Sequence, residues 1–174
     1  MIELPVDFYV SSVGITAEIW NNNLDRFSIC DMVFDTGASM TTIDTTIAIR
    51  TGYSLIEAEN VVVSGAGDGA ISAKRVILRD FKLGGVAIGP VVVDVLDFPV
   101  NGNVFALLGM NIIKEFDVIA KFKDKRPKPE KRDATIYMNP LFDLRDKVSY
   151  DKYLPMQSRF GVWVSYNSKK GSFI

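Results

Sequence analysis

The 174-residue chain contains no histidine and a single cysteine, Cys30. The absence of histidine excludes imidazole as the general acid or base of a catalytic site. A lone cysteine excludes an internal disulfide bond, so we expect Cys30 to be a small buried hydrophobic residue. Any acid–base chemistry must therefore rely on other side chains, of which the carboxylates are the most plausible.

Long apolar runs and a strong charge bias are also absent. No stretch of about 18 apolar residues occurs, so we expect no membrane span. The N-terminal residues 1–5 lack the basic region and apolar core of a signal peptide, which with the free cysteine favours the cytoplasm. Because 48% of the residues are hydrophobic and the net charge is −1, we predict a globular protein with one sizeable core and neither a nucleic-acid nor a membrane partner.

Short apolar or alternating runs separated by turn residues predict a β-rich fold. The expected strands are Val6–Val10, Ile15–Trp20, Ile29–Phe34, Val61–Val63, Arg75–Leu83, Val86–Leu96, Phe105–Leu108, Val118–Phe122 and Ala134–Met138. Helical spacing is limited to Asp44–Thr51 and Met110–Phe116. The pattern favours an all-β domain with one or two short helices.

The sequence Asp35-Thr36-Gly37-Ala38-Ser39 follows the expected strand Ile29–Phe34. That strand is apolar enough to be buried on both faces at its end, and Gly37 permits a tight turn directly after it. Asp35 is then a rigidly held, partly desolvated carboxylate, which suits a general acid or base. An ordinary surface turn is the alternative, because Asp, Thr, Gly and Ser are all common in turns.

A glycine-rich segment, Ser64–Ile71, contains Gly65, Ala66, Gly67, Asp68 and Gly69. Alternating glycines could indicate a phosphate-binding loop, but such a loop must open a helix, and here another strand follows. A β-hairpin with a flexible tip is favoured. It could close over a substrate as a flap or be an inert hairpin.

The Asp35-Thr36-Gly37 turn, the glycine-rich segment and a later Leu107-Leu108-Gly109 occur in the order that the same parts have in retropepsin-like aspartic proteases, which the chain resembles. The resemblance covers roughly residues 5–138. It is strongest to the bacterial single-domain members of that family. The resemblance implies a closed β-barrel-like half-protease in which Ser64–Ile71 is the flap. It also implies that Leu107-Leu108-Gly109 supports the catalytic loop and that Thr36 locks two such loops together. Ala38 goes with activity at mildly acidic to neutral pH in that family. The substrate-pocket walls are expected to include Ile43, Ile71, Val91 and Leu96.

Peptide hydrolysis by this route requires two carboxylates that share a proton, and aspartic proteases are the standard example of such a pair. No second Asp-Thr-Gly or Asp-Ser-Gly follows Asp35, and the length corresponds to one domain. We therefore predict an aspartic endopeptidase that acts on polypeptides as a homodimer, each copy contributing Asp35 across a twofold axis. The water is activated by the two carboxylates, so neither a metal nor another cofactor is expected.

Two other functions remain open. The chain could be a catalytically silent retropepsin-like module that dimerises or binds peptides by strand addition. It could also be a monomeric structural β-domain in which Asp35-Thr36-Gly37 is only a turn.

The domain is expected to cover residues 1–140, with a C-terminal extension over 141–174. The extension contains an alternating run, Arg159–Tyr166, which together with Val6–Val10 is a candidate for a dimer-interface sheet, with Trp163 buried there or against its own subunit. The segment Lys121–Arg132 has seven basic and two acidic side chains. We interpret it as a solvated loop, the alternative being contact with nucleic acid or an acidic partner.

Overall fold

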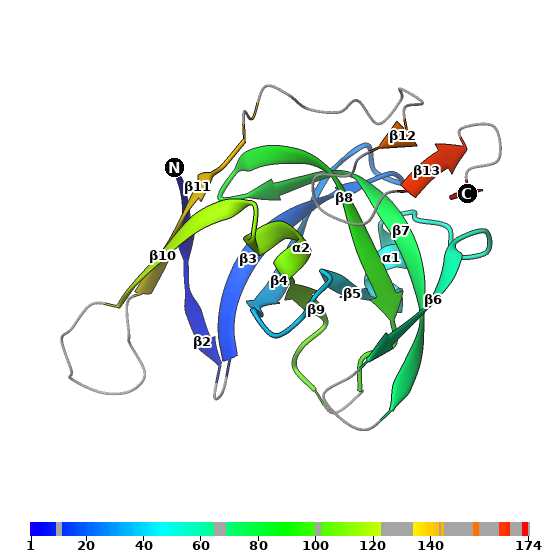
Figure 1. Cartoon of the computed structure of the whole chain (residues 1–174), viewed down its shortest axis with the longest axis horizontal. Helices are drawn as coiled ribbons and strands as arrows, with labels where there is room; N and C mark the ends of the chain where they lie inside the picture. The colour runs from blue at the N-terminus through cyan, green and yellow to red at the C-terminus, as the bar shows by residue number, and fades with distance from the viewer. Residues whose placement is uncertain are drawn as a thin grey trace.

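A computed structural model describes residues 1–9, 12–64, 69–99, 102–122, 134–142, 144, 155–156, 164–167 and 172–173. Strands dominate these residues, as Figure 1 shows. The helices α1 (Thr45–Arg50) and α2 (Met110–Ile113) are both short. No helix in the described part of the chain has the length and apolar character that a membrane span requires.

An eight-stranded sheet forms the body of the molecule. Its strand order is β2 (Asp7–Tyr9), β3 (Ser12–Asn21), β4 (Arg26–Phe34), β9 (Ala106–Leu108), β5 (Thr42–Asp44), β8 (Val86–Leu96), β7 (Ala70–Leu83) and β6 (Glu59–Ser64). The sheet closes on itself because β3 also pairs with β7, from Ala17 opposite Leu83 to Ile19 opposite Phe81. The predicted closed barrel is confirmed, with β2 and β6 extending beyond the closure.

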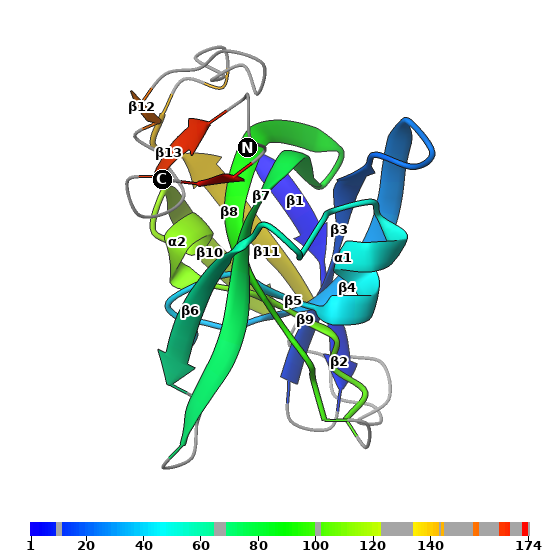
Figure 2. The ribbon, with the colours of Figure 1, turned by 90° about the vertical axis from the view of Figure 1, so that its right-hand side faces the viewer.

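A second sheet lies beside the barrel in both ribbon views (Figures 1 and 2). It has the order β1 (Ile2–Pro5), β11 (Ala134–Pro140) and β10 (Phe116–Phe122), and all its pairs are antiparallel. The first strand thus pairs with β11 of its own chain, from Ile2 opposite Met138 to Pro5 opposite Thr135. Nearer the C-terminus, β13 (Val164–Asn167) pairs with both β12 (Pro155–Met156) and β14 (Ser172–Phe173).

The hydrophobic core fills the barrel and the space between it and the second sheet. Strand alternation supplies it, since β4 buries Cys30 and Met32 while Ile29 and Asp31, which alternate with them, are exposed. Cys30 is buried as predicted, and this burial, with a smaller effect from Asp31, raises the pKa of its thiol to about 12. The largest fully buried side chains are Phe81, Ile2, Leu4, Ile19, Met32, Ile43, Leu78, Leu83, Leu108, Ile112, Met138 and Val91.

The hairpin between β7 and β8 is the longest among the strands that the structure describes, and it depends on a two-glycine turn. Gly84 and Gly85 have φ of +52° and +76° and connect Leu83 to Val86. Positive φ at both central residues is the conformation that suits a two-residue hairpin and that side chains resist. A Cβ at Gly84 would also lie 2.7 Å from the carbonyl oxygen of Glu3, so the turn packs directly on β1.

Several predicted boundaries were wrong. The expected helix Met110–Phe116 ends at Ile113, because Phe116 pairs with Pro140 as the first residue of β10 and packs its ring on Phe142. The expected strand Val6–Val10 begins one residue later, as β2, because the Val6 amide donates to Ala134 O between β1 and β2. Val10 lies outside the described residues.

Candidate active site

The end of β4 positions Asp35. Val33 and Phe34 pair in parallel with Leu107 and Leu108 of β9, and the Asp35 amide extends this ladder by donating to Leu108 O (3.0 Å). The backbone of Asp35 is thus fixed by the barrel, although its side chain stays partly exposed. Val33 and Phe34 are partly buried as well, so the end of β4 is not fully buried on either face, in contrast to the expectation from the sequence.

The turn after β4 closes on the carboxylate. The Gly37 amide donates to Asp35 Oδ1 (2.8 Å), and the Ala38 amide donates to Asp35 O (3.3 Å). A Cβ at Gly37 would lie 3.1 Å from Asp35 Oδ1, a tight approach that glycine avoids. Thr36, Gly37 and Ser39 are exposed, so the tip of this loop faces outward.

Gly109 lies against the far side of the same loop. A Cβ there would approach Met40 O to 2.5 Å and Thr41 N to 2.6 Å, and both are backbone atoms with little freedom to move. The Gly109 amide donates to Thr41 Oγ1 (3.1 Å), and the Met110 amide donates to Ala38 O (2.8 Å). Leu108 and Gly109 therefore contact the Asp35 loop directly.

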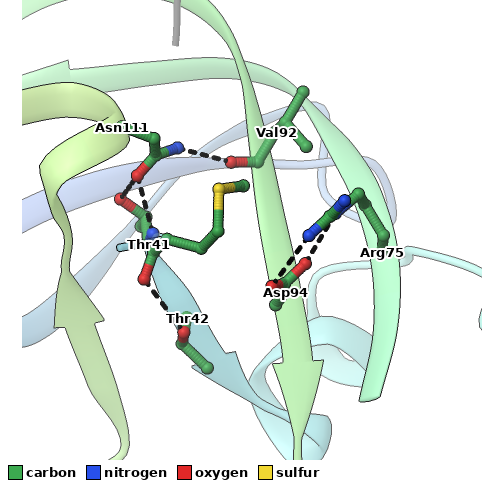
Figure 3. Close-up of polar contacts among 7 residues, drawn as sticks. Thr41, Thr42, Arg75, Val92, Asp94 and Asn111 are labelled. Carbon is green, nitrogen blue, oxygen red and sulfur yellow. Dashed lines mark hydrogen bonds and ion pairs between the residues drawn. The ribbon is translucent and has the colours of Figure 1, made fainter. Parts of the chain in front are cut away.

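Asn111 completes this support and was not predicted. Its Oδ1 accepts from both the amide (2.7 Å) and the hydroxyl (2.8 Å) of Thr41, and its Nδ2 donates to Val92 O (3.0 Å), as Figure 3 shows. Thr41 and Asn111 are both buried. The sequence signal for this role is an asparagine inside the otherwise apolar run Leu107–Ile113, since a buried amide requires partners.

One acidic side chain of the barrel, Asp94, is held by a specific donor. Asp94 on β8 is completely buried and forms a two-pronged ion pair with Arg75 on β7, Nε to Oδ1 at 2.8 Å and Nη2 to Oδ2 at 3.1 Å. The hydrogen bond with Asp94 raises the pKa of Arg75 despite partial burial. Among the described residues, no three His, Cys, Asp or Glu side chains gather in a way that could hold a metal ion.

Comparison with known proteins identifies the family. A family model described as aspartyl protease matches residues 17–112, more than half of the chain. The chain belongs to the aspartyl protease family. The matched span begins in β3, includes the Asp35 loop and ends in α2, so it contains both sides of the Thr41–Asn111 contact.

A solved structure shares the fold of this aspartyl protease. The crystal structure of a retropepsin-like aspartic protease from Rickettsia conorii matches with a TM-score of 0.52 and 19% sequence identity, covering 79% of this chain and 92% of that chain. At this identity the likeness concerns the fold, which is retropepsin-like as predicted. No curated protein matches the sequence.

The strands on either side of the glycine-rich segment form the predicted hairpin. β6 and β7 pair antiparallel from Glu59 opposite Arg75 to Ser64 opposite Ala70, and Gly69 is exposed. Gly65, Ala66, Gly67 and Asp68 lie outside the described residues, as do residues 123–132 of the basic segment and Trp163.

Two of the four expected pocket walls were wrong. Ile43 and Val91 are fully buried and belong to the core cluster, so they have no surface to offer a substrate. Ile71, in contrast, is exposed on the hairpin, and Leu96 is half-buried.

Proposed function

We propose that this aspartyl protease is an endopeptidase that acts as a homodimer, with Asp35 of each subunit forming the catalytic pair. The observation that carries the proposal is the way the protein holds Asp35. Its backbone is part of the β4–β9 ladder, its carboxylate accepts from Gly37, and the loop behind it rests on Gly109 and Asn111. These contacts fix the position of the Asp35 carboxylate, so that it cannot move away from a bound substrate.

The homodimer follows from the number of carboxylates that the chemistry needs. Two carboxylates that share one proton can activate a water and protonate the substrate carbonyl, whereas one cannot do both at once. The chain contains a single Asp-Thr-Gly. The exposed position of Thr36 and Gly37 leaves the loop tip accessible to the same loop of a second copy, in an isologous contact.

In the reaction, the ionised Asp35 takes a proton from a water molecule as its oxygen attacks the peptide carbonyl carbon. The protonated Asp35 of the second copy donates to the carbonyl oxygen, giving a neutral tetrahedral intermediate. The C–N bond then breaks as the amide nitrogen is protonated by one carboxyl group and a hydroxyl proton returns to the other. The products are a carboxylic acid and an amine, and the shared proton is restored.

The β6–β7 hairpin is proposed to cover the substrate. Its strands expose Val62 and Ile71, which are 74% and 42% accessible, near the tip. Apolar side chains exposed at such a position would pack on a bound peptide and exclude water from the carboxylates.

The test compares Asp35→Asn with Asp31→Asn in the cleavage of a denatured protein. Asp31 lies on the same strand, is exposed, and accepts a hydrogen bond from Thr16. Cleavage should vanish in Asp35→Asn and persist in Asp31→Asn, and a statine-type peptide should inhibit the wild type. Cleavage that survives Asp35→Asn excludes the proposal, whereas peptide binding without cleavage by the wild type favours a silent peptide-binding module.

A further inference from the structure

One row of side chains crosses the barrel beside Asp35. The strand registers align Val33 with Leu107, Leu107 with Thr42, Thr42 with Asp94, and Asp94 with Arg75. Directly paired residues project from the same face of a sheet. These five residues, called here the cleft row, therefore share one face, and Figure 3 shows Asp94 between Thr42 and Arg75.

The cleft row lies on the face that carries Asp35. Asp35 follows Val33 by two residues, and the ladder to β9 continues through its amide, so both side chains project to the same side. The neighbouring positions Ile43, Ala106 and Leu108 belong to the hydrophobic core. No member of the cleft row belongs to that core cluster.

The cleft row changes from apolar to ionic with distance from Asp35. Val33 and Leu107 are partly buried, Thr42 is 8% accessible, and the Asp94 side chain is inaccessible. Arg75 is 16% accessible, so it is the member of the ion pair that solvent or a ligand can reach. Glu59, opposite Arg75 on β6, is exposed and strengthens the cationic form of Arg75.

Asp94 fixes the orientation of Arg75. It accepts from Nε and Nη2, which leaves the remaining N–H groups of the guanidinium without a partner among the described residues. A guanidinium held in this way is preorganised to donate to a second acceptor. Stability alone is a weak explanation for the pair, because a buried ion pair rarely contributes more than apolar residues of the same size.

We propose that Arg75 is a specificity-determining residue that binds a glutamate or glutamine side chain of the substrate, with Asp94 as its positioning residue. This inference rests on the proposed peptidase function, because it takes the face beside Asp35 as the peptide-binding face. The terminal oxygen of that side chain would accept from Arg75, the accessible member of the ion pair.

The experiment uses peptides built on one cleavage site that the enzyme selects in a denatured protein. Glu, Gln, Met or Lys is placed at each position on either side of the cleaved bond, and kcat/KM is measured. At one position Glu and Gln should exceed Met and Lys by about tenfold or more. Binding of the same peptides to Asp35→Asn is measured in parallel, so the preference is tested even without turnover.

The decisive variant is Arg75→Met with Asp94→Leu, because Arg75→Met alone would leave a buried carboxylate unpaired and could prevent folding. The double variant should lose the preference for Glu and Gln while still cleaving the Met peptide. Lys82→Met is the matched control. Lys82 is also a cation on β7 paired with an acid, Glu18 at 3.9 Å, but it lies toward the far end of the strand.

Two results would overturn the inference: equal use of Glu, Gln, Met and Lys peptides at every position, or an unchanged preference in the double variant. Failure of the proposed function has a different signature. Cleavage would then be absent or independent of Asp35, while the binding measurements would still report whether Arg75 selects the side chain.

Discussion

Thr41 donates two hydrogen bonds, from its amide and its hydroxyl, to one acceptor, Asn111 Oδ1, at 2.7 and 2.8 Å. The contact joins residues seventy positions apart and connects the loop after Asp35 to α2. Because both residues are buried, neither water nor another side chain replaces the acceptor easily when it is removed.

We therefore predict that Asn111→Ala lowers the free energy of unfolding by about 2 to 3 kcal/mol, because it leaves two buried donors unsatisfied. Urea denaturation measures the change. Asn60→Ala, an exposed asparagine on β6, is the control and should change stability by less than about 0.5 kcal/mol. Equal effects of the two substitutions would show that the Thr41–Asn111 contact contributes nothing particular.

A second prediction concerns the close approach at Gly109. Gly109→Ala would force a Cβ against Met40 and Thr41 backbone atoms, so the Asp35 loop must shift. We expect a loss of about 1 to 3 kcal/mol in stability and a fall in peptidase activity in the protein that remains folded. Gly69→Ala, where nothing lies within 4 Å of the added Cβ, should leave the unfolding midpoint unchanged. A stable Gly109→Ala variant would contradict the packing argument.

Much of the fold was predictable because the local signals agree with one another. The runs that form β7 and β8 contain continuous apolar stretches, Val76–Leu78 and Val91–Val93, and are joined by Gly84-Gly85, so both strands and their turn could be inferred from short-range patterns. The same holds for the strand β4 that leads to Asp35 and for the strand β9 that leads to Gly109. Each depends on a run of residues with few alternative conformations.

The features that the sequence did not reveal depend on long-range contacts. β5, only three residues long, is a strand because it fits between β8 and β9, and its sequence Thr42–Asp44 carries no strong pattern of its own. The roles of Asn111 and of the Arg75–Asp94 pair follow from strand register. Register is set by the whole barrel, so these pairs could not be inferred from spacing along the chain.

A third prediction uses the pH dependence of stability. Burial alone would raise the pKa of Asp44, but hydrogen bonds from the Thr46 hydroxyl, the Phe98 amide and the Thr46 amide outweigh this and hold its pKa below the ordinary value of 3.8. The ionised form is thus favoured by folding. The stabilisation is present above the unfolded-state pKa and is lost as the pH falls through the lower folded-state value.

Asp44→Asn should therefore reduce the loss of stability on acidification below about pH 4. It should also lower stability at neutral pH by about 1 kcal/mol, because Asp44 accepts with both oxygens, Oδ1 from Thr46 and Oδ2 from the Phe98 amide, and an amide has one acceptor oxygen. Unfolding midpoints measured from neutral to strongly acidic pH test this. Asp25→Asn is the control, since Asp25 is exposed at φ +50°, a conformation that asparagine also adopts. Identical pH profiles for Asp44→Asn and the wild type would contradict the assignment.

A fourth prediction tests whether two copies share one catalytic pair. Wild type and Asp35→Asn are mixed in equal amounts, unfolded together and refolded, so that subunits pair at random. About one quarter of the pairs then contain two intact carboxylates. Because a pair with one Asn cannot share a proton in the required way, activity should fall to about one quarter of that of the same total amount of wild type.

A chain that acts alone would instead retain about one half of the activity, since dilution would be the only effect. Mixing with Asp31→Asn, which leaves Asp35 intact, should cause no loss and controls for the refolding step. The measurement must be made well above the dissociation constant of the dimer, because dilution alone lowers the activity of any enzyme whose site is assembled from two subunits. An activity of one half at saturating concentration would place both catalytic groups within one chain, and the homodimer proposal would then be wrong.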